Sequence, residues 1–261
     1  MSKKNKLAKF KDNETFKCLF QPTTNDLLNK DYTYKGKWGK EVFKNDNPIV
    51  LELGCGKGEY TIALAEQFPN KNFIGIDIKG ARLWKGAKYV NNNNIPNAIF
   101  IRSRIEFINS IFGNNEISEI WITFADPQIK KPRKCLTGSM FLNKYIQFLK
   151  DDGITHLKTD SLYLYQYTLA STLKNSIQII HSIPDIYSLN TNQLKEMNLP
   201  DGLTTIRTFY ENYYIKNGFT IKYLSVLLKK PLSPFVEPEW EEEYWRGKEA
   251  EGREQLLANK G

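Results

Sequence analysis

The middle of the chain alternates short apolar runs with segments of helical periodicity. Apolar runs that predict buried strands occupy residues 48–53, 73–77, 99–102, 119–124 and 153–158. Apolar positions at helical spacing follow at residues 60–68, 81–89, 105–112 and 141–149. Because strands that alternate with helices at this interval form right-handed crossovers, the pattern predicts an α/β fold built on a parallel sheet.

Two later stretches predict an edge of this sheet. Residues 204–208 and 219–228 have the residue types of strands, and Asn217-Gly218 between them is a strong turn signal. We therefore expect a mostly parallel seven-stranded sheet with an antiparallel edge pair and helices on both faces.

The absence of an internal repeat indicates one folded domain with tails. The expected parts are a basic N-terminal arm and lead-in at 1–44, the candidate catalytic domain at 45–232 and a Glu-rich C-terminal tail at 233–261. We expect the arm to be flexible, because its lysines leave few apolar residues that could pack. These lysines are Lys3, Lys4, Lys6, Lys9, Lys11 and Lys17. The tail carries eight Glu and four basic residues from position 237 onward, and the sequence assigns it no role.

Charge and cysteine content narrow the classes of protein further. The chain has 37 Lys and Arg against 29 Asp and Glu, a net charge of +8. This charge suggests a polyanionic partner such as a nucleic acid, although a basic protein without such a partner fits it as well. The chain shows no apolar run of about 18 residues, no secretory signal and no CxxC pair among its three Cys. These features predict a cytoplasmic protein with no membrane span, no disulfide framework and no metal site.

A glycine-rich turn follows the first predicted strand. Gly54, Gly56 and Gly58 alternate with other residues after Glu52, near the end of that strand. Ligands of open α/β sheets bind at this turn, and Asp77 ends the second strand, where a carboxylate can bind both hydroxyls of a ribose. The alternation differs from the GxGxxG of dinucleotide sites. In addition, Glu52 would repel a pyrophosphate but suits an amino group or a sulfonium.

This combination resembles the class I S-adenosylmethionine-dependent methyltransferases. The resemblance implies a Rossmann-like fold and S-adenosyl-L-methionine as cofactor, bound by Glu52, the three glycines and Asp77. A dinucleotide-dependent oxidoreductase is the less favoured enzyme. For the glycines taken alone, a tight turn without any ligand is the alternative.

The loop after the fourth predicted strand carries candidate acceptor chemistry. An acid at the carboxyl end of a strand suits a methyl acceptor beside the cofactor, and the basic residues that follow suit phosphate contacts. Here the chain resembles the tRNA (guanine-N7)-methyltransferase family, whose motif is Pro-Asp-Pro-Trp-Pro-Lys-Lys. The matching residues are Asp126, Pro127, Lys130 and Lys131. The departures are Ala125 for the first Pro and Gln128-Ile129 for Trp-Pro.

Two further segments extend the resemblance over roughly residues 45–230. His156-Leu157-Lys158-Thr159-Asp160 is similar to the family's His-x-Lys-Thr-Asp, and Thr208-Phe209-Tyr210-Glu211 is similar to its Thr-x-Tyr-Glu. The resemblance implies a catalytic, cofactor-contacting role for Asp126. It implies substrate binding by Lys130, Asp160, Thr208 and Glu211. Arg104 follows the strand where relatives carry Asp or Asn for the adenine, so either Arg104 or the local backbone is expected to contact that ring.

The function that the resemblance implies is methyl transfer to N7 of a guanine in tRNA, with the variable-loop guanine as the family expectation. Guanine N7 has a free lone pair and no proton to remove, so alignment matters more than a strong base. One alternative is a methyltransferase that acts on another RNA, on DNA or on protein. A non-catalytic RNA-binding protein on the same fold is the alternative from a different class. The oligomeric state stays open between monomer and homodimer.

Overall fold

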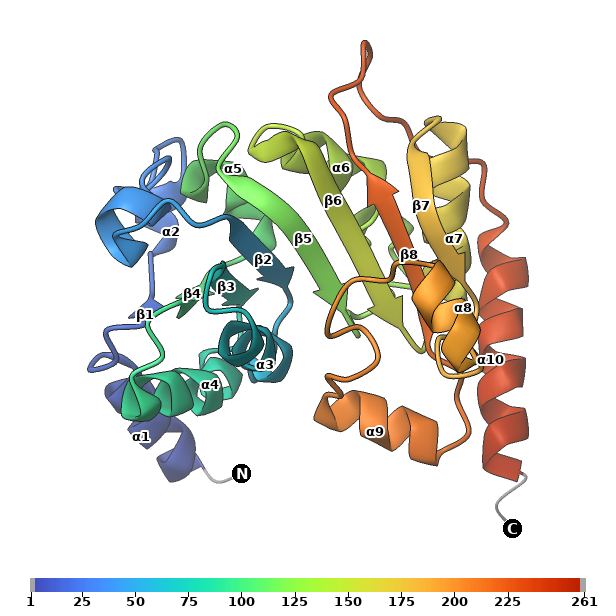
Figure 1. Cartoon of the computed structure of the whole chain (residues 1–261), viewed down its shortest axis with the longest axis horizontal. Helices are drawn as coiled ribbons and strands as arrows, with labels where there is room; N and C mark the ends of the chain where they lie inside the picture. Colours follow the sequence, from blue (N-terminus) through green and yellow to red (C-terminus); the bar gives the residue numbers. More distant parts are fainter. Residues whose placement is uncertain (1–2, 259–261) are drawn as a thin grey trace. The chain divides into compact units, whose positions relative to one another are not determined.

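The computed structural model describes residues 3–258, and the chain forms two compact units (Figure 1). The first unit runs to Thr123 and also contains Lys144–Gly153. The second unit contains Phe124–Asn143 and the residues from Ile154 onward. Each unit is described by itself below.

The first unit is built on five parallel strands. Along the sheet their order is β1, β4, β3, β2, β5, and each strand is parallel to its neighbours. Their bounds are β1 Leu19–Phe20, β2 Ile49–Leu53, β3 Asn72–Asp77, β4 Ala98–Arg102 and β5 Ile117–Thr123. Every residue of β2 and β3 is buried, as expected for parallel strands that are covered on both faces. The predictions of strands at 48–53, 73–77, 99–102 and 119–124 are therefore confirmed.

The first unit also contains five α-helices among the described residues. The α-helices are α1 Lys3–Asn13, α2 Thr24–Leu27, α3 Glu59–Gln67, α4 Gly80–Asn93 and α5 Ile108–Ile111. Shorter turns are a π-helical segment at Trp38–Phe43 and a 3-10 turn at Ile105–Phe107. Both α3 and α4 lie where helical spacing predicted them. Helix α6, Ser139–Tyr145, begins in the second unit and ends in the first.

The N-terminal segment is helical where the sequence predicted a flexible arm. The Asn13 amide donates to the Gly80 carbonyl at 3.0 Å, and the Trp84 indole N–H donates to Asp12 at 2.9 Å. The Lys9 ammonium lies over the Trp84 ring, 4.4 Å from its centroid. These contacts fix α1 on α4, and they join residues about 70 positions apart, which no local pattern predicts. The expectation of a flexible arm is therefore wrong over the described part of this segment.

The second unit contains an antiparallel arrangement of three strands. β8 (Lys222–Leu227) pairs antiparallel with both β6 (Leu149–Thr159) and β7 (Gln178–Ile183). The first residues of β6, up to Gly153, belong to the first unit. The helices are α7 Leu162–Lys174, α8 Thr191–Glu196, α9 Phe209–Lys216 and α10 Glu242–Ala258, with a 3-10 turn at Pro132–Lys134. The fold class is thus confirmed as α/β with a mostly parallel sheet and an antiparallel pair.

Two details of the predicted sheet are wrong. The described residues form eight strands rather than seven, because the two-residue β1 pairs with β4. The antiparallel partners of β8 are β6 and β7, not residues 204–208. Thr208 accepts from the Glu211 N–H at 3.1 Å and so begins α9, and Gly218, with φ +81°, follows its end. Asn-Gly therefore ends a helix here, a position that favours the same residues as a hairpin turn.

Candidate active site

The glycine turn of the first unit has a backbone that only glycine adopts easily. Gly56 has φ +58° and Gly58 has φ +72°, both in the left-handed region. A Cβ on Gly58 would lie 2.4 Å from the Phe100 ring, so this position excludes every larger residue. A Cβ on Gly54 or Gly56 would have no neighbour within 4 Å. The turn therefore exposes its backbone to open space, where a ligand can approach it closely.

Asp77 fixes the turn from the end of β3. Its Oδ2 accepts from the Gly56 N–H at 3.0 Å, and its Oδ1 accepts from the Lys79 N–H at 2.7 Å. The side chain is buried, and both of its partners are backbone amides without a positive charge. The result is an oriented carboxylate beside the glycine turn, with further acceptor capacity on each oxygen.

Glu52 lies behind the turn, in contact with the chain's own donors. Its Oε2 accepts from the Thr61 N–H at 2.9 Å and from the Thr61 hydroxyl, and its Oε1 accepts from the Thr123 hydroxyl at 2.5 Å. Burial raises the pKa of this carboxyl to about 7. Glu52 thus ties β2, α3 and β5 together. The sequence identified the acid but not its two threonine partners, because neither belongs to a recognisable motif.

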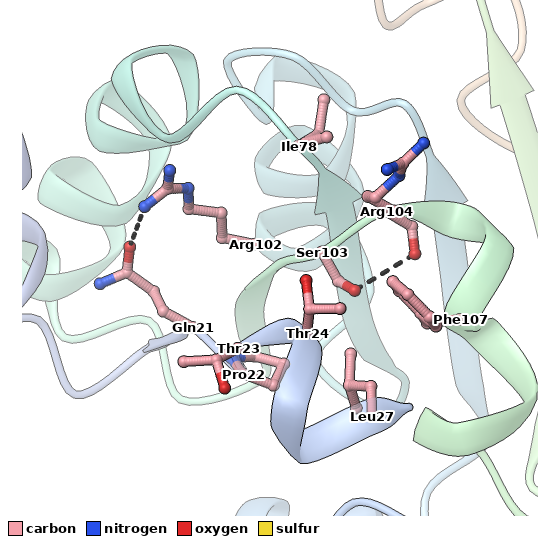
Figure 2. Close-up of a pocket in the computed structure, with 10 residues that line it drawn as sticks. All are labelled: Gln21, Pro22, Thr23, Thr24, Leu27, Ile78, Arg102, Ser103, Arg104 and Phe107. Atoms are coloured by element: carbon pink, nitrogen blue, oxygen red, sulfur yellow. Dashed lines mark hydrogen bonds between the residues drawn. The ribbon is translucent and has the colours of Figure 1, made fainter. Parts of the chain in front are cut away.

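A cavity of about 300 Å³ opens beside Asp77 in the first unit (Figure 2). The Ser103 N–H donates to the Asp77 carbonyl at 3.2 Å, which places the cavity at the carboxyl ends of β3 and β4. Its lining residues are Gln21, Pro22, Thr23, Thr24, Leu27, Ile78, Arg102, Ser103, Arg104 and Phe107. Figure 2 shows Arg102 reaching Gln21, while the Arg104 side chain extends away from Leu27. Arg104 therefore lines the cavity, and its guanidinium lies 3.6 Å from Glu106.

The loop that carries Asp126 belongs to the second unit. The Asp126 side chain is exposed, and its Oδ1 accepts from the Gln128 N–H at 3.0 Å. Phe124 and Gln128 both have left-handed backbones, with φ of 50° and 53°, so the loop turns sharply on either side of Asp126. The Cys135 thiol donates to the Pro127 carbonyl at 2.9 Å, which ties the two ends of this loop together. Lys130 is exposed on the same loop.

Glu211 is fully buried in an ion pair. The Lys158 ammonium lies 2.7 Å from its Oε1, and both side chains are 0% exposed. The Tyr187 hydroxyl donates to the same oxygen at 2.6 Å, and the Thr208 N–H donates to Oε2 at 3.4 Å. Burial lowers the pKa of Lys158, while Glu211 raises it. This arrangement fixes the start of α9, and Glu211 faces donors of its own chain.

Asp160 directly follows β6, and an ion pair with Arg253 holds its carboxylate. Its Oδ2 accepts from Arg253 Nη2 at 2.8 Å, and 7% of the residue is exposed. Burial raises the pKa of Asp160, and the nearby Arg253 lowers it. The sequence identified Asp160 but missed Arg253, because 93 residues separate them and nothing local marks the arginine.

The Asp126 loop, α9 and the Asp160 pair are connected through aromatic packing. The Phe124 N–H donates to the Lys158 carbonyl at 2.9 Å, and the Phe124 ring stacks on Tyr214 with centroids 6.0 Å apart. The Arg253 guanidinium lies 5.9 Å from the same Tyr214 ring. In the second unit, contacts of Phe124 and Tyr214 therefore link the start of the Asp126 loop to α9 and to the Asp160–Arg253 pair.

The described residues contain no candidate metal-binding cluster and no candidate membrane-spanning helix. No group of three or more His, Cys, Asp or Glu side chains within them lies close enough to hold a metal ion. No helix in that part of the chain is both long and apolar enough to span a bilayer.

Comparison with known proteins identifies the family. Residues 46–223 match a protein family described as "Putative methyltransferase". The chain is 49% identical over 231 residues to the tRNA (guanine-N(7)-)-methyltransferase of Christiangramia forsetii, and this alignment covers 88% of the chain and 100% of the relative. It is 44% identical to the protein of the same name from Bacteroides fragilis, over 86% of each sequence.

A solved structure agrees at the level of the fold. An antibiotic-related methyltransferase superposes with a TM-score of 0.50 and 17% identity, covering 72% of this chain and 90% of that one. This similarity shows a shared methyltransferase fold, while the sequence relatives show the family. The chain belongs to the tRNA (guanine-N7)-methyltransferase family.

Proposed function

We propose that this protein transfers a methyl group from S-adenosyl-L-methionine to N7 of a guanine in tRNA. The observation that carries the proposal is the 49% identity to a tRNA (guanine-N(7)-)-methyltransferase over that relative's whole length. The Asp126-Pro127 and Lys130-Lys131 pairs support it, because they match the family's acceptor motif. For the modified position we adopt the family expectation, the variable-loop guanine.

The first unit fits the cofactor. Asp77 is oriented by two backbone amides and can accept from the ribose hydroxyls, while the open space over Gly54 and Gly56 suits the methionine part. The cavity beside Asp77 suits the adenine, with Arg104 at its wall. Bound there, S-adenosyl-L-methionine supplies a methyl group on a positively charged sulfur. Glu52 acts mainly by joining β2 and α3, which flank the glycine turn, and a cation bound nearby favours its ionised form.

The second unit supplies acceptors for the guanine. The N1–H and 2-amino group of guanine are donors. The exposed Asp126 and the partly accessible Asp160 can therefore accept hydrogen bonds from that edge of the base. Positive charge develops on the purine as the methyl group arrives, and a nearby Asp126 carboxylate stabilises it. Thr208 and Glu211 act by fixing the start of α9. Lys130 contacts phosphate or the base O6 from the exposed loop.

The partner that these roles require is tRNA, and the net charge of +8 favours its binding. We place the reaction in the cytoplasm, and the free Cys18, Cys55 and Cys135 fit a reducing compartment. The protein acts as a monomer or a homodimer, and a mass measurement in solution distinguishes the two.

The decisive experiment is incubation of the protein with S-adenosyl-L-methionine and unmodified tRNA, followed by nucleoside mass spectrometry. We expect 7-methylguanosine at one position of the tRNA. Methylation only of another RNA, of DNA or of protein would refute the proposed substrate. tRNA binding without any methyl transfer would refute the enzyme.

A further inference from the structure

The C-terminal segment, which the sequence left unassigned, is built into the second unit. The Trp240 indole N–H donates to the Tyr163 hydroxyl at 3.0 Å, and its ring lies edge-on to both Tyr163 and Tyr167 at 5.3 Å. Glu237 accepts from the Ser139 hydroxyl at 2.6 Å. Helix α10 then runs alongside α7 (Figure 1). The segment is therefore a structural part of the unit that carries the acceptor acids.

Glu249 anchors α10 at the start of α7. Its Oε2 accepts from the Tyr163 N–H at 3.0 Å, one of the first amides of α7, which have no partner within their own helix. Its Oε1 accepts from Arg253 Nε at 3.1 Å and from Nη2 at 2.8 Å. Glu249 is buried, so these contacts fix the guanidinium on its own helix one turn further along.

The fixed guanidinium then reaches Asp160. Arg253 Nη2 donates to Asp160 Oδ2 at 2.8 Å, and the guanidinium carbon lies 5.3 Å from the Phe219 ring and 5.9 Å from the Tyr214 ring. This hydrogen bond and ion pair engage Oδ2 of the carboxylate, and 7% of Asp160 is exposed. Arg253 thus fixes one oxygen of the Asp160 carboxylate.

We propose that Arg253 is a positioning residue for guanine recognition, which holds Asp160 so that Oδ1 accepts a hydrogen bond from the 2-amino group of the base. The inference rests on the proposed function, because it requires guanine as the acceptor. It also gives the C-terminal helix a role, as the element that carries this arginine.

The charges around Asp160 give the proposal a pH dependence. Burial raises the pKa of Asp160, and Arg253 opposes that rise, whereas Glu249 on α10 adds to it. Lys222 donates to the Asp160 carbonyl at 2.9 Å from β8, and Tyr214 faces the carboxylate from α9. Without Arg253 the pKa of Asp160 rises further. Asp160 then protonates at higher pH and loses acceptor capacity toward guanine.

The test compares tRNA that carries guanine at the acceptor position with tRNA that carries inosine there. Inosine keeps N7 and lacks the 2-amino group, so the ratio of kcat/KM values reports contacts to that group. The variants are Arg253→Met and Arg253→Lys, with Lys248→Met as the matched control. Lys248 lies on the same helix and pairs with Glu251 at 3.0 Å on the exposed face.

We expect the wild type to prefer guanine roughly 10-fold or more, the value of one hydrogen bond to a charged acceptor. In Arg253→Met the preference should fall to within about 3-fold, and the acid limb of the kcat/KM profile should move to higher pH. Arg253→Lys should lie between the two, and Lys248→Met should match the wild type. Calorimetric affinity for S-adenosyl-L-methionine should be equal in all four proteins.

Several results would overturn the inference. One such result is an active wild type that does not discriminate inosine from guanine. Another is an Arg253→Met enzyme with full preference for guanine and an unchanged pH profile. Either result contradicts this inference but leaves the proposed function intact. Faster methylation by Arg253→Met also contradicts it, because the arginine would then block Asp160. If melting curves show that Arg253→Met does not fold, wild-type preference and pH profile in Arg253→Lys overturn the inference. An inactive wild type overturns the proposed function as well.

Discussion

The two units hold the buried acids of the proposed site in different ways. In the first unit Asp77 is held by backbone amides and Glu52 by one amide and two hydroxyls, all of them neutral donors. In the second unit Glu211 is held by Lys158 and Asp160 by Arg253, which are cations. Neutral donors orient a carboxylate without compensating its charge, whereas cations orient it and compensate it.

This difference matches the ligand part that we propose for each unit. A cationic sulfonium or amino group is attracted by charge that stays uncompensated, as in the first unit. A neutral guanine needs hydrogen-bond acceptors in fixed positions, and a compensated carboxylate supplies these without a large desolvation cost. The comparison predicts that charge removal affects cofactor binding in the first unit and folding or base recognition in the second.

The largest effect is expected at the buried pair of the second unit. Lys158→Met leaves the Glu211 carboxylate buried without its cation, which typically costs about 3–5 kcal/mol of the free energy of unfolding. Urea unfolding measures the loss. The double variant Lys158→Met/Glu211→Leu should recover much of it, and exposed Lys195→Met should have no effect. Wild-type stability in the single variant would show that the pair is not a structural centre of this unit.

The exposed acid of the second unit should affect turnover rather than folding. Asp126→Asn removes a charge beside the site where the purine becomes cationic, and such losses typically lower kcat on the order of 100-fold. Steady-state methylation of unmodified tRNA measures kcat, with melting curves to verify the fold. A near-normal kcat would mean that Asp126 does not stabilise the transition state.

Asp77 tests the neutral donors of the first unit. Asp77→Ala should weaken binding of S-adenosyl-L-methionine by about 1.5–3 kcal/mol, because charge-assisted bonds to the ribose and the restraint on Gly56 are both lost. Calorimetry measures the affinity, and Asp46→Ala on an exposed loop of the same unit is the control. Unchanged affinity would remove the ribose-binding role, and equal weakening in the control would remove its specificity.

Glu52 gives this comparison a pH dependence. Its pKa is raised from 4.5 to about 7. The protonated group therefore contributes fully to the free energy of unfolding below pH 4.5, and this contribution is lost as the pH rises through 7. The free energy of unfolding should fall by about 2 kcal/mol more in the wild type than in Glu52→Gln between pH 5 and pH 8. Urea unfolding at both pH values measures this, with exposed Glu106→Gln as control. Parallel behaviour of wild type and Glu52→Gln would place the titration elsewhere.

The two units also differ in how much of their site could be predicted. The glycine turn, Glu52 and Asp77 follow directly from local sequence, because backbone amides and short turns make most of their contacts. The Glu52 partners Thr61 and Thr123 could not be predicted from the sequence, since a threonine on a helix or strand has no distinctive pattern. In the second unit Asp160 was predictable from a motif. Its partner Arg253 was not, since only tertiary packing of α10 places it there.

The same reasoning explains the errors in the fold. Thr208-x-x-Glu211 begins a helix through reciprocal side-chain contacts, and this overrides the strand propensity of residues 204–208. The lysines of α1 suggested a mobile arm, but Asp12, Asn13 and Trp84 fix that helix on α4. In both cases contacts outside the periodic pattern decided the structure.

The smallest effect is expected at Lys130, an exposed residue of the second unit. This cation lies on the exposed loop of the second unit, where it meets phosphate or O6 and contributes about equally to the ground state and the transition state. Lys130→Ala should raise the KM for tRNA by about 3–10-fold at physiological salt and leave kcat near the wild-type value. If one phosphate contact is lost, the slope of log affinity against log salt should flatten by about 0.7–0.9. Exposed Lys195→Ala is the control. A defect confined to kcat would make Lys130 part of the chemistry rather than of tRNA placement.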